Sequence, residues 1–137
     1  MPAGDATSVA FYPASQLNDI IRNLAHDTST GRTFGAYSGF HYVESRRVVP
    51  GSPEVHDDWI DVTIVQSGRA TLVTGGRVSG SHLIAAGEHR GGMITGGKST
   101  PIAAGDFFVI PKGIPHQYVV ACGDSIVYLT IKIGKGR

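Results

Sequence analysis

The pattern of apolar and polar positions predicts one short helix near the start of the chain. The apolar positions recur at the spacing that places them on one face of a helix: Leu17, Ile20, Ile21 and Leu24. Ser15 is predicted to be the N-cap, and the composition of residues 28–31 is expected to end the helix. We expect this helix to pack against the outside of a sheet, after a loosely ordered lead-in over residues 1–14.

From Phe34 onward the pattern is typical of strands. Short runs rich in β-branched and apolar residues alternate with turn signals, and 19 glycines and 7 prolines in 137 residues indicate many tight turns. The predicted strands are residues 40–49, 59–66, 70–74, 107–110, 117–121 and 125–133, with a short turn at 67–69. Such spacing favours a closed barrel or sandwich. We therefore divide the chain into a lead-in with its helix, residues 1–33, and one β-barrel domain, residues 34–137.

Residues 75–105 form a long connection that contains three Gly-Gly pairs. Connections of this length are usually functional or mobile. The segment is either a lid or wall of a pocket mouth, with a short strand within residues 81–86, or a decorated hairpin with no role. Glu88 and Arg90 lie between glycines in this segment. They either bind an acidic group of a ligand or form an exposed ion pair.

Candidate chemistry comes from two distant pieces of the chain. Side chains at i and i+2 of a strand share a face, so Glu54 and His56 should project together. Asp61 follows His56 at an odd offset, so it can join them only if the chain turns at residues 57–58. His116 follows a rigid corner of proline and glycine, which fixes its imidazole at the start of a strand. Two imidazoles and two carboxylates would then meet.

The second of these pieces resembles a signature motif of the cupin superfamily. The residues that carry the likeness are Gly105, then Pro111 after five residues, Gly113 after one more, and His116 after two more. The family motif usually ends in Asn four residues after the histidine, where this chain has Val120.

The first piece resembles the other cupin motif in its spacing. The family frame is His-x-His, Glu, then Gly, and here the same positions are Glu54, His56, Asp61 and Gly68. The first histidine has become glutamate and the glutamate has become aspartate. The leading glycine of the family is replaced by Val49.

The resemblance, over roughly residues 40–133, implies an all-β fold. This would be a cupin-like double-stranded β-helix barrel (a jelly roll) with one N-terminal α-helix packed outside. It also implies a homodimer and a divalent transition metal (Fe, Mn, Ni or Zn) inside the barrel. The expected metal ligands are Glu54, His56, Asp61 and His116. Asp61 and Glu54 are also the expected catalytic residues, each as a ligand or as a general base.

Two functions remain open from the residues. One is a metal-dependent enzyme of dioxygenase, isomerase or lyase type, acting on a small organic molecule. Two histidines and a carboxylate resemble the facial triad of non-haem iron enzymes, which favours this function. The other is a non-catalytic small-molecule binding or sensor protein of the same fold, without metal. A binding protein would tolerate the altered first motif more readily.

Composition excludes several other classes. The length suggests one domain, and a net charge of +1 without a basic stripe argues against a nucleic-acid partner. No apolar run approaches the roughly 20 residues that a membrane span needs. The start of the chain lacks the pattern of a signal peptide. The single cysteine, Cys122, rules out an internal disulfide and is expected to be a small apolar side chain. These features fit a cytoplasmic protein.

Overall fold

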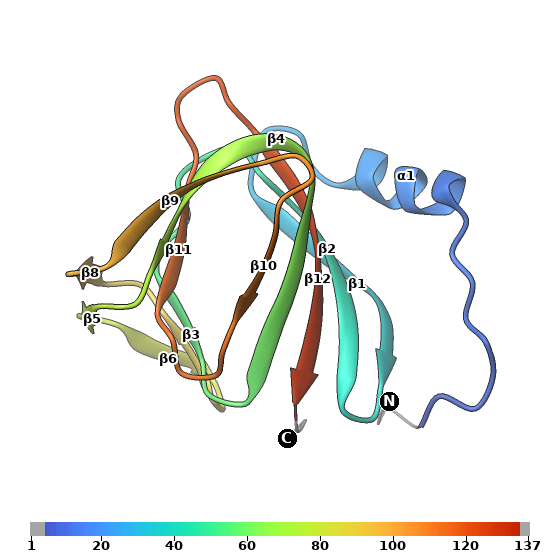
Figure 1. The fold of residues 1–137 in the computed structure, drawn as a ribbon, viewed down its shortest axis with the longest axis horizontal. Coiled ribbons are helices and arrows are strands. Elements are labelled where there is room, and N and C mark those ends of the chain that lie inside the picture. The colour runs from blue at the N-terminus through green and yellow to red at the C-terminus, as the bar shows by residue number, and fades with distance from the viewer. Residues whose placement is uncertain (1–4, 135–137) are drawn as a thin grey trace.

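The computed structural model describes residues 5–134 as a curled antiparallel barrel with one helix outside it (Figure 1). The helix is α1 (Ala14–Asn23). The strands are β1 (Thr30–Tyr37), β2 (Phe40–Arg47), β3 (Glu54–His56), β4 (Trp59–Thr74), β5 (Arg77–Ser79), β6 (His82–Ala85), β7 (Glu88–Arg90), β8 (Met93–Thr95), β9 (Lys98–Ala103), β10 (Phe107–Ile110), β11 (His116–Val119) and β12 (Ile126–Gly134). The expected all-β barrel with an outer helix is confirmed.

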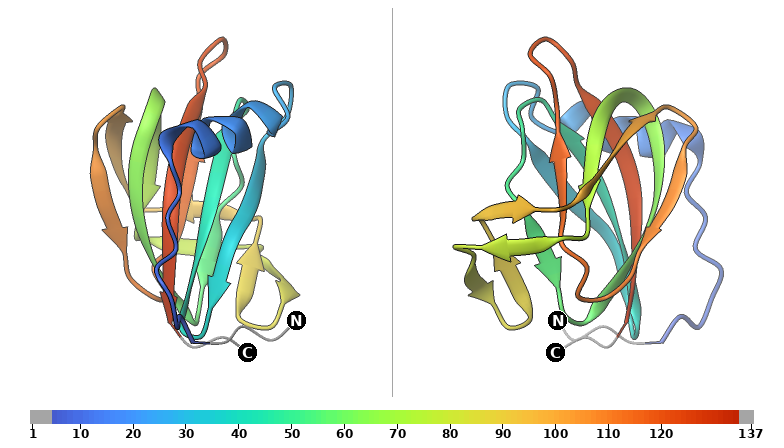
Figure 2. Two further views of the ribbon diagram at one scale, coloured as in Figure 1. Left: turned by 90° about the vertical axis from the view of Figure 1, so that its right-hand side faces the viewer. Right: turned by 60° about the vertical axis from the view of Figure 1, so that its left-hand side comes forward.

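The strand order brings the two candidate motifs together. The main sheet runs β1-β2-β12-β4-β11-β3-β7-β6, with β9 and β10 also paired to β4, and β5 pairs with β8 as a separate ribbon. The sheet curls around a central space, as the two views in Figure 2 show. As a result β11, which begins with His116, lies between β4 and β3.

One long strand, β4, belongs to both halves of the barrel. Its first half pairs with β10 and β12, and its second half pairs with β9 and β11. The prediction of two strands separated by a turn at residues 67–69 is wrong. Gly68 adopts a left-handed φ of 76°, opposite a register shift at Val127 and Tyr128. This is the geometry of a bulge, which bends a strand without ending it.

The helix carries the predicted apolar stripe but begins and ends elsewhere. Ile20 and Leu24 are buried, and α1 packs against β2. Its N-cap is Pro13 instead of Ser15, with no side-chain cap bond within the described part of the chain. The proline ring fixes φ at a value that suits the start of a helix. The helix ends at Asn23, ahead of residues 28–31. No helix within residues 5–134 is long and apolar enough to cross a bilayer.

The segment before the helix is tied to the barrel by aromatic contacts. Tyr12 packs edge-on against Phe34 and Tyr42, with ring centroids 5.2 and 5.8 Å away. The first strand begins at Thr30, four residues ahead of the expected Phe34. Tyr12 therefore covers the sheet, and residues 30–33 form part of it.

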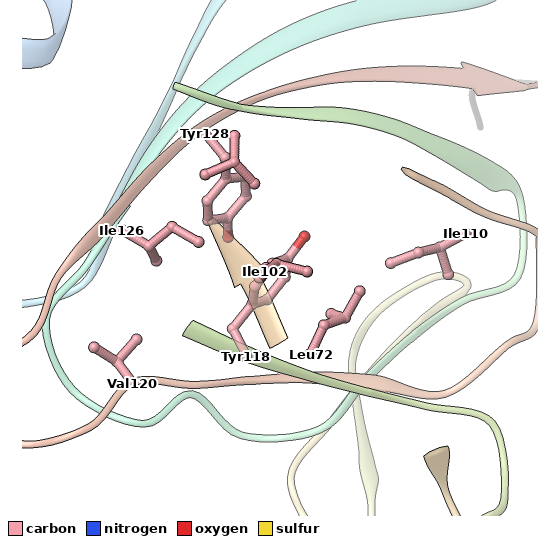
Figure 3. Close-up of a cluster of buried hydrophobic side chains, with 8 residues drawn as sticks. Leu72, Ile102, Ile110, Tyr118, Val120, Ile126 and Tyr128 are labelled. Atoms are coloured by element: carbon pink, nitrogen blue, oxygen red, sulfur yellow. The ribbon is translucent and has the colours of Figure 1, made fainter. Parts of the chain in front are cut away.

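An apolar core fills one part of the barrel interior (Figure 3). Tyr118 and Tyr128 stack in parallel at its centre, with ring centroids 4.6 Å apart. The buried residues of this core are Val65, Leu72, Ile102, Ile110, Tyr118, Val120, Ile126 and Tyr128. Val120, which replaces the usual asparagine of the cupin motif, is therefore a packing residue.

A buried carboxylate in β2 lacks the partners that its charge requires. The Glu44 side chain is fully buried, and Gln66 Nε2 donates to its Oε1 at 2.8 Å. Its Oε2 and the Oε1 of Gln66 have no hydrogen-bond partner among the described residues. Burial raises the pKa of Glu44 to about 6, although the Gln66 hydrogen bond acts in the opposite direction. The protonated, neutral form of the Glu44 carboxyl therefore suits this buried position better than the charged form.

We expect Glu44→Gln to stabilise the protein at about pH 8 and to have little effect at about pH 4. Because the folded pKa is raised, the stability from neutral Glu44 is complete below the ordinary pKa and is lost as the pH rises through about 6. Glutamine is neutral at every pH and also offers a donor for Gln66, so the gain should be about 1–2 kcal/mol. Urea unfolding at both pH values measures it. The exposed carboxylate Asp27, changed to Asn, is the control, and an equal gain at both pH values would contradict the argument.

Candidate metal centre

Cross-strand register positions the side chains of the candidate site. Glu54 in β3 lies opposite His116 on one side and opposite Arg90 on the other. His56, two residues along β3, lies opposite Glu88. Residues that are far apart in the sequence therefore face one another because β3 is held between β11 and β7.

The turn required between His56 and Asp61 is present. The chain leaves β3 after His56 and enters β4 at Trp59, with a bend at residues 57–58. The His56 Nε2 atom lies 3.5 Å from Asp61 Oδ2, and His116 Nε2 lies 3.9 Å from the same oxygen. The backbone N–H of Gly113 donates to the His56 carbonyl at 2.8 Å, which ties the proline-glycine corner to β3. The side chains of His56, Asp61 and His116 are all buried.

The Nδ1 atom of each histidine forms a hydrogen bond that fixes the orientation of the ring. His56 Nδ1 donates to the Glu88 carboxylate at 2.9 Å, and His116 Nδ1 donates to the Ile114 carbonyl at 3.1 Å. Such bonds fix the tautomer that leaves Nε2 without a proton and so able to act as a metal ligand. Burial lowers the pKa of His116, which outweighs the opposite influence of the nearby carboxylates Glu54 and Asp61. The ring is therefore neutral and able to donate a lone pair.

Three of the four expected ligands form a compact group. One donor atom each from His56, Asp61 and His116 lies within 4.8 Å of the other two. Two imidazoles and one carboxylate are ligands that suit divalent first-row metals. A metal ion could therefore be held at this position by donor atoms that already converge.

Glu54 reaches the same cavity but is already occupied by two arginines. Arg47 donates to its Oε2 at 2.9 Å, and Arg90 pairs with its Oε1 at 2.8 Å. Its Oε2 lies 4.0 Å from His116 Nε2. Burial alone would raise the pKa of Glu54, but Arg47, followed by His116 and Arg90, lowers it below its usual value. The carboxylate is therefore ionised and paired.

Comparison with known proteins bears on the fold. No family model matches the chain, and no curated protein sequence matches it. Among solved structures, BH2720 from Bacillus halodurans is similar over 98% of this chain and 89% of its own, with 13% identity and a TM-score of 0.65. A cupin 2 conserved barrel domain protein from Rhodopseudomonas palustris matches over 80% of this chain and 63% of its own, with 15% identity and a TM-score of 0.53. The fold is that of the cupin barrels.

The polyketide cyclase RemF from Streptomyces resistomycificus shares this cupin fold. It is similar over 78% of this chain, with 21% identity and a TM-score of 0.54. This chain spans 66% of the cyclase and 63% of the cupin 2 protein. At these identities the likeness shows the cupin fold alone.

A lysine lies beside the convergent donors inside the cupin barrel. Lys132 in β12 is directly opposite Asp61 in β4, and its Nζ donates to Asp61 Oδ1 at 2.7 Å. The same nitrogen lies 3.4 Å from His56 Nε2. A cation of the chain itself therefore neutralises Asp61.

The cavity that these groups line has a volume of about 330 Å³, within the usual range for small-molecule sites. Two buried atoms on its wall, Thr30 Oγ1 and Arg90 Nε, have no hydrogen-bond partner among residues 5–134. Arg47, which also lines the cavity, lies 4.9 Å over the Tyr118 ring and donates to the Tyr128 hydroxyl at 2.7 Å. The lining thus combines charged side chains with two aromatic rings.

The connection over residues 75–105 supplies one wall of this cavity through β7. Glu88 holds His56 and Arg90 holds Glu54, so the alternative of an exposed ion pair between Glu88 and Arg90 is wrong. The reason is register, because β7 pairs with β3 and turns both side chains toward it.

Arg47 and Lys132 were not identified from the sequence. A signal for Lys132 was present. Tyr128, Thr130 and Lys132 alternate along β12, and all three line the cavity. Alternation of this kind places polar side chains on one face of a strand.

Proposed function

We propose that the chain binds a divalent transition metal through His56, Asp61 and His116 and acts on a small organic molecule in the adjoining cavity. The observation that carries this proposal is the orientation of both histidines, whose Nδ1 atoms are bound outward while their Nε2 atoms face Asp61. When bound, the metal would polarise an oxygen of the ligand as a Lewis acid.

In this proposal the remaining side chains hold the site in place. Glu88 orients the His56 ring, and Glu54 orients Arg47 and Arg90 instead of serving as a fourth ligand. The catalytic roles expected for Glu54 and Asp61 stay predictions. Arg90 Nε and Thr30 Oγ1, which have no hydrogen-bond partner within residues 5–134, favour a ligand that carries both an acceptor and a polar group near the cavity wall.

A second candidate function is supported by the lysine. The ion pair between Lys132 and Asp61 already neutralises the carboxylate, so the cavity could serve as a metal-free binding site for a small molecule. The similarity to a polyketide cyclase concerns the fold and does not choose between the two functions. The expected homodimer also stays a prediction.

Elemental analysis distinguishes the two functions. Protein would be purified freshly without added metal or chelator, and Fe, Mn, Ni and Zn would be quantified together with protein concentration. We expect about one metal ion per chain, because the three donors form a single group. A chain that contains none, and that binds none of the four ions in calorimetric titrations, would support the metal-free binding protein.

A further inference from the structure

Lys132 is held where a metal would compete with it. The residue lies near the end of the β4–β12 pairing, between the pairs Ile131–Val62 and Ile133–Ile60. Only 18% of its side chain is exposed, and its Nζ contacts Asp61 at 2.7 Å and His56 at 3.4 Å. The ammonium therefore lies against two of the three side chains proposed as metal ligands.

Those contacts are incompatible with a metal at the same donors. An ammonium has three donors and no acceptor, so it cannot serve as a ligand, and its charge repels a divalent cation nearby. The lone pair of His56 Nε2 is directed at Nζ, which also donates to Asp61 Oδ1, while Asp61 Oδ2 faces the two histidines. A metal that took His56 Nε2 would have to replace the lysine there, and its charge would compete with the ammonium for the Asp61 carboxylate.

The other cations of the cavity do not share this conflict. Arg47 and Arg90 are both held by Glu54, so their charge is directed to a different carboxylate. Arg47 is further fixed by the Tyr128 hydroxyl. Lysine, by contrast, carries its charge on a flexible four-carbon stem that can leave one partner for another.

We propose that Lys132 is a tethered cation that competes with the metal for Asp61 and His56. In the metal-free protein its ammonium neutralises Asp61, and metal binding displaces it into the cavity. The metal affinity of the natural chain is consequently lower than its three donors would give alone. This inference rests on the proposed metal site, and it names the residue that sets the occupancy of that site.

Titration with Co²⁺ alone tests the inference, because its visible absorption reports the coordination directly and needs no substrate. We expect Lys132→Met to bind Co²⁺ about tenfold or more tightly than the natural chain, since it removes the competing charge. Lys132→Arg keeps a cation and should show little gain. Lys98→Met, which removes an exposed lysine on β9, is the matched control and should bind as the natural chain does.

The possible results separate this inference from the proposed function. Equal Co²⁺ affinity in the natural chain and in Lys132→Met would overturn the inference and leave the metal site standing. Weaker binding in Lys132→Met would also overturn it, because the lysine would then support the metal. No binding in either protein would overturn both. If Lys132→Met does not fold, as judged by thermal melting, Lys132→Gln replaces it in the same titration.

Discussion

His116→Ala is expected to reduce the affinity for Co²⁺ by at least about 100-fold while the barrel remains folded. The variant removes one of the two imidazole ligands. Removing a residue that only hydrogen-bonds to a metal ligand commonly lowers metal affinity about 10- to 100-fold, so loss of a ligand itself should lower it at least as much. His56 and Asp61 would remain, and two donors do not define a stable site for this class of metal. Calorimetric and absorption titration with Co²⁺ measures the loss.

Two further variants make this result specific. His116 is almost fully buried, so alanine leaves a cavity, whereas His116→Gln keeps most of the side-chain volume and removes the imidazole. His89→Ala removes a different histidine, one that pairs with Asp57 at 3.0 Å. We expect His116→Gln to lose the metal and His89→Ala to keep it. Unchanged binding in both His116 variants, with melting temperatures near that of the natural chain, would exclude His116 as a ligand.

The parts of the fold that the sequence predicts are those set by local pattern. The helical stripe of Ile20 and Leu24 is buried as its spacing requires, and strand β10 begins and ends where its apolar run does. The convergence of His56 and Asp61 was also foreseeable, because an odd offset demands a bend and acidic residues at 57–58 allow one.

The remainder depends on register between distant strands, which no local pattern contains. Arg47 reaches Glu54 and Tyr128 because β2, β12 and the start of β3 meet at one end of the cavity. Lys132 meets Asp61 only because β12 pairs with β4 in one particular register, and a one-residue slip would turn it outward. The turn predicted at Gly68 is wrong for a related reason. A glycine between two apolar runs is compatible with either a turn or a bulge, and only strand pairing decides between them.

Glu54 has partners that its position in the cupin frame does not predict. That position makes it a candidate ligand, which stays a prediction. Its contacts instead place one carboxylate between two guanidinium groups, with 7% of its own side chain exposed. Removing this carboxylate would leave two guanidinium groups without their shared partner.

Glu54→Gln should therefore destabilise the barrel by about 3 kcal/mol at neutral pH, because removing one partner of a buried ion pair leaves charge without compensation. Most of this loss should come from Arg47, because its side chain is only 16% exposed and cannot be solvated once its partner is removed. The Arg90 side chain is 36% exposed and can be solvated in part. Urea unfolding at neutral pH measures the loss. Asp124→Asn breaks the Arg69 pair, whose arginine side chain is 73% exposed, and should cost less than about 1 kcal/mol.

The pH dependence of this loss identifies its origin. The pKa of Glu54 is lowered in the folded state, although burial opposes that shift, because Arg47, His116 and Arg90 favour the ionised form. Its contribution is therefore present above the ordinary pKa of a glutamate and disappears as the pH falls through the lowered folded value. The natural chain and Glu54→Gln should converge in stability under acid conditions, while a loss caused by altered packing would persist. A difference that stays constant from neutral to acid pH would show that the arginines do not depend on the Glu54 charge.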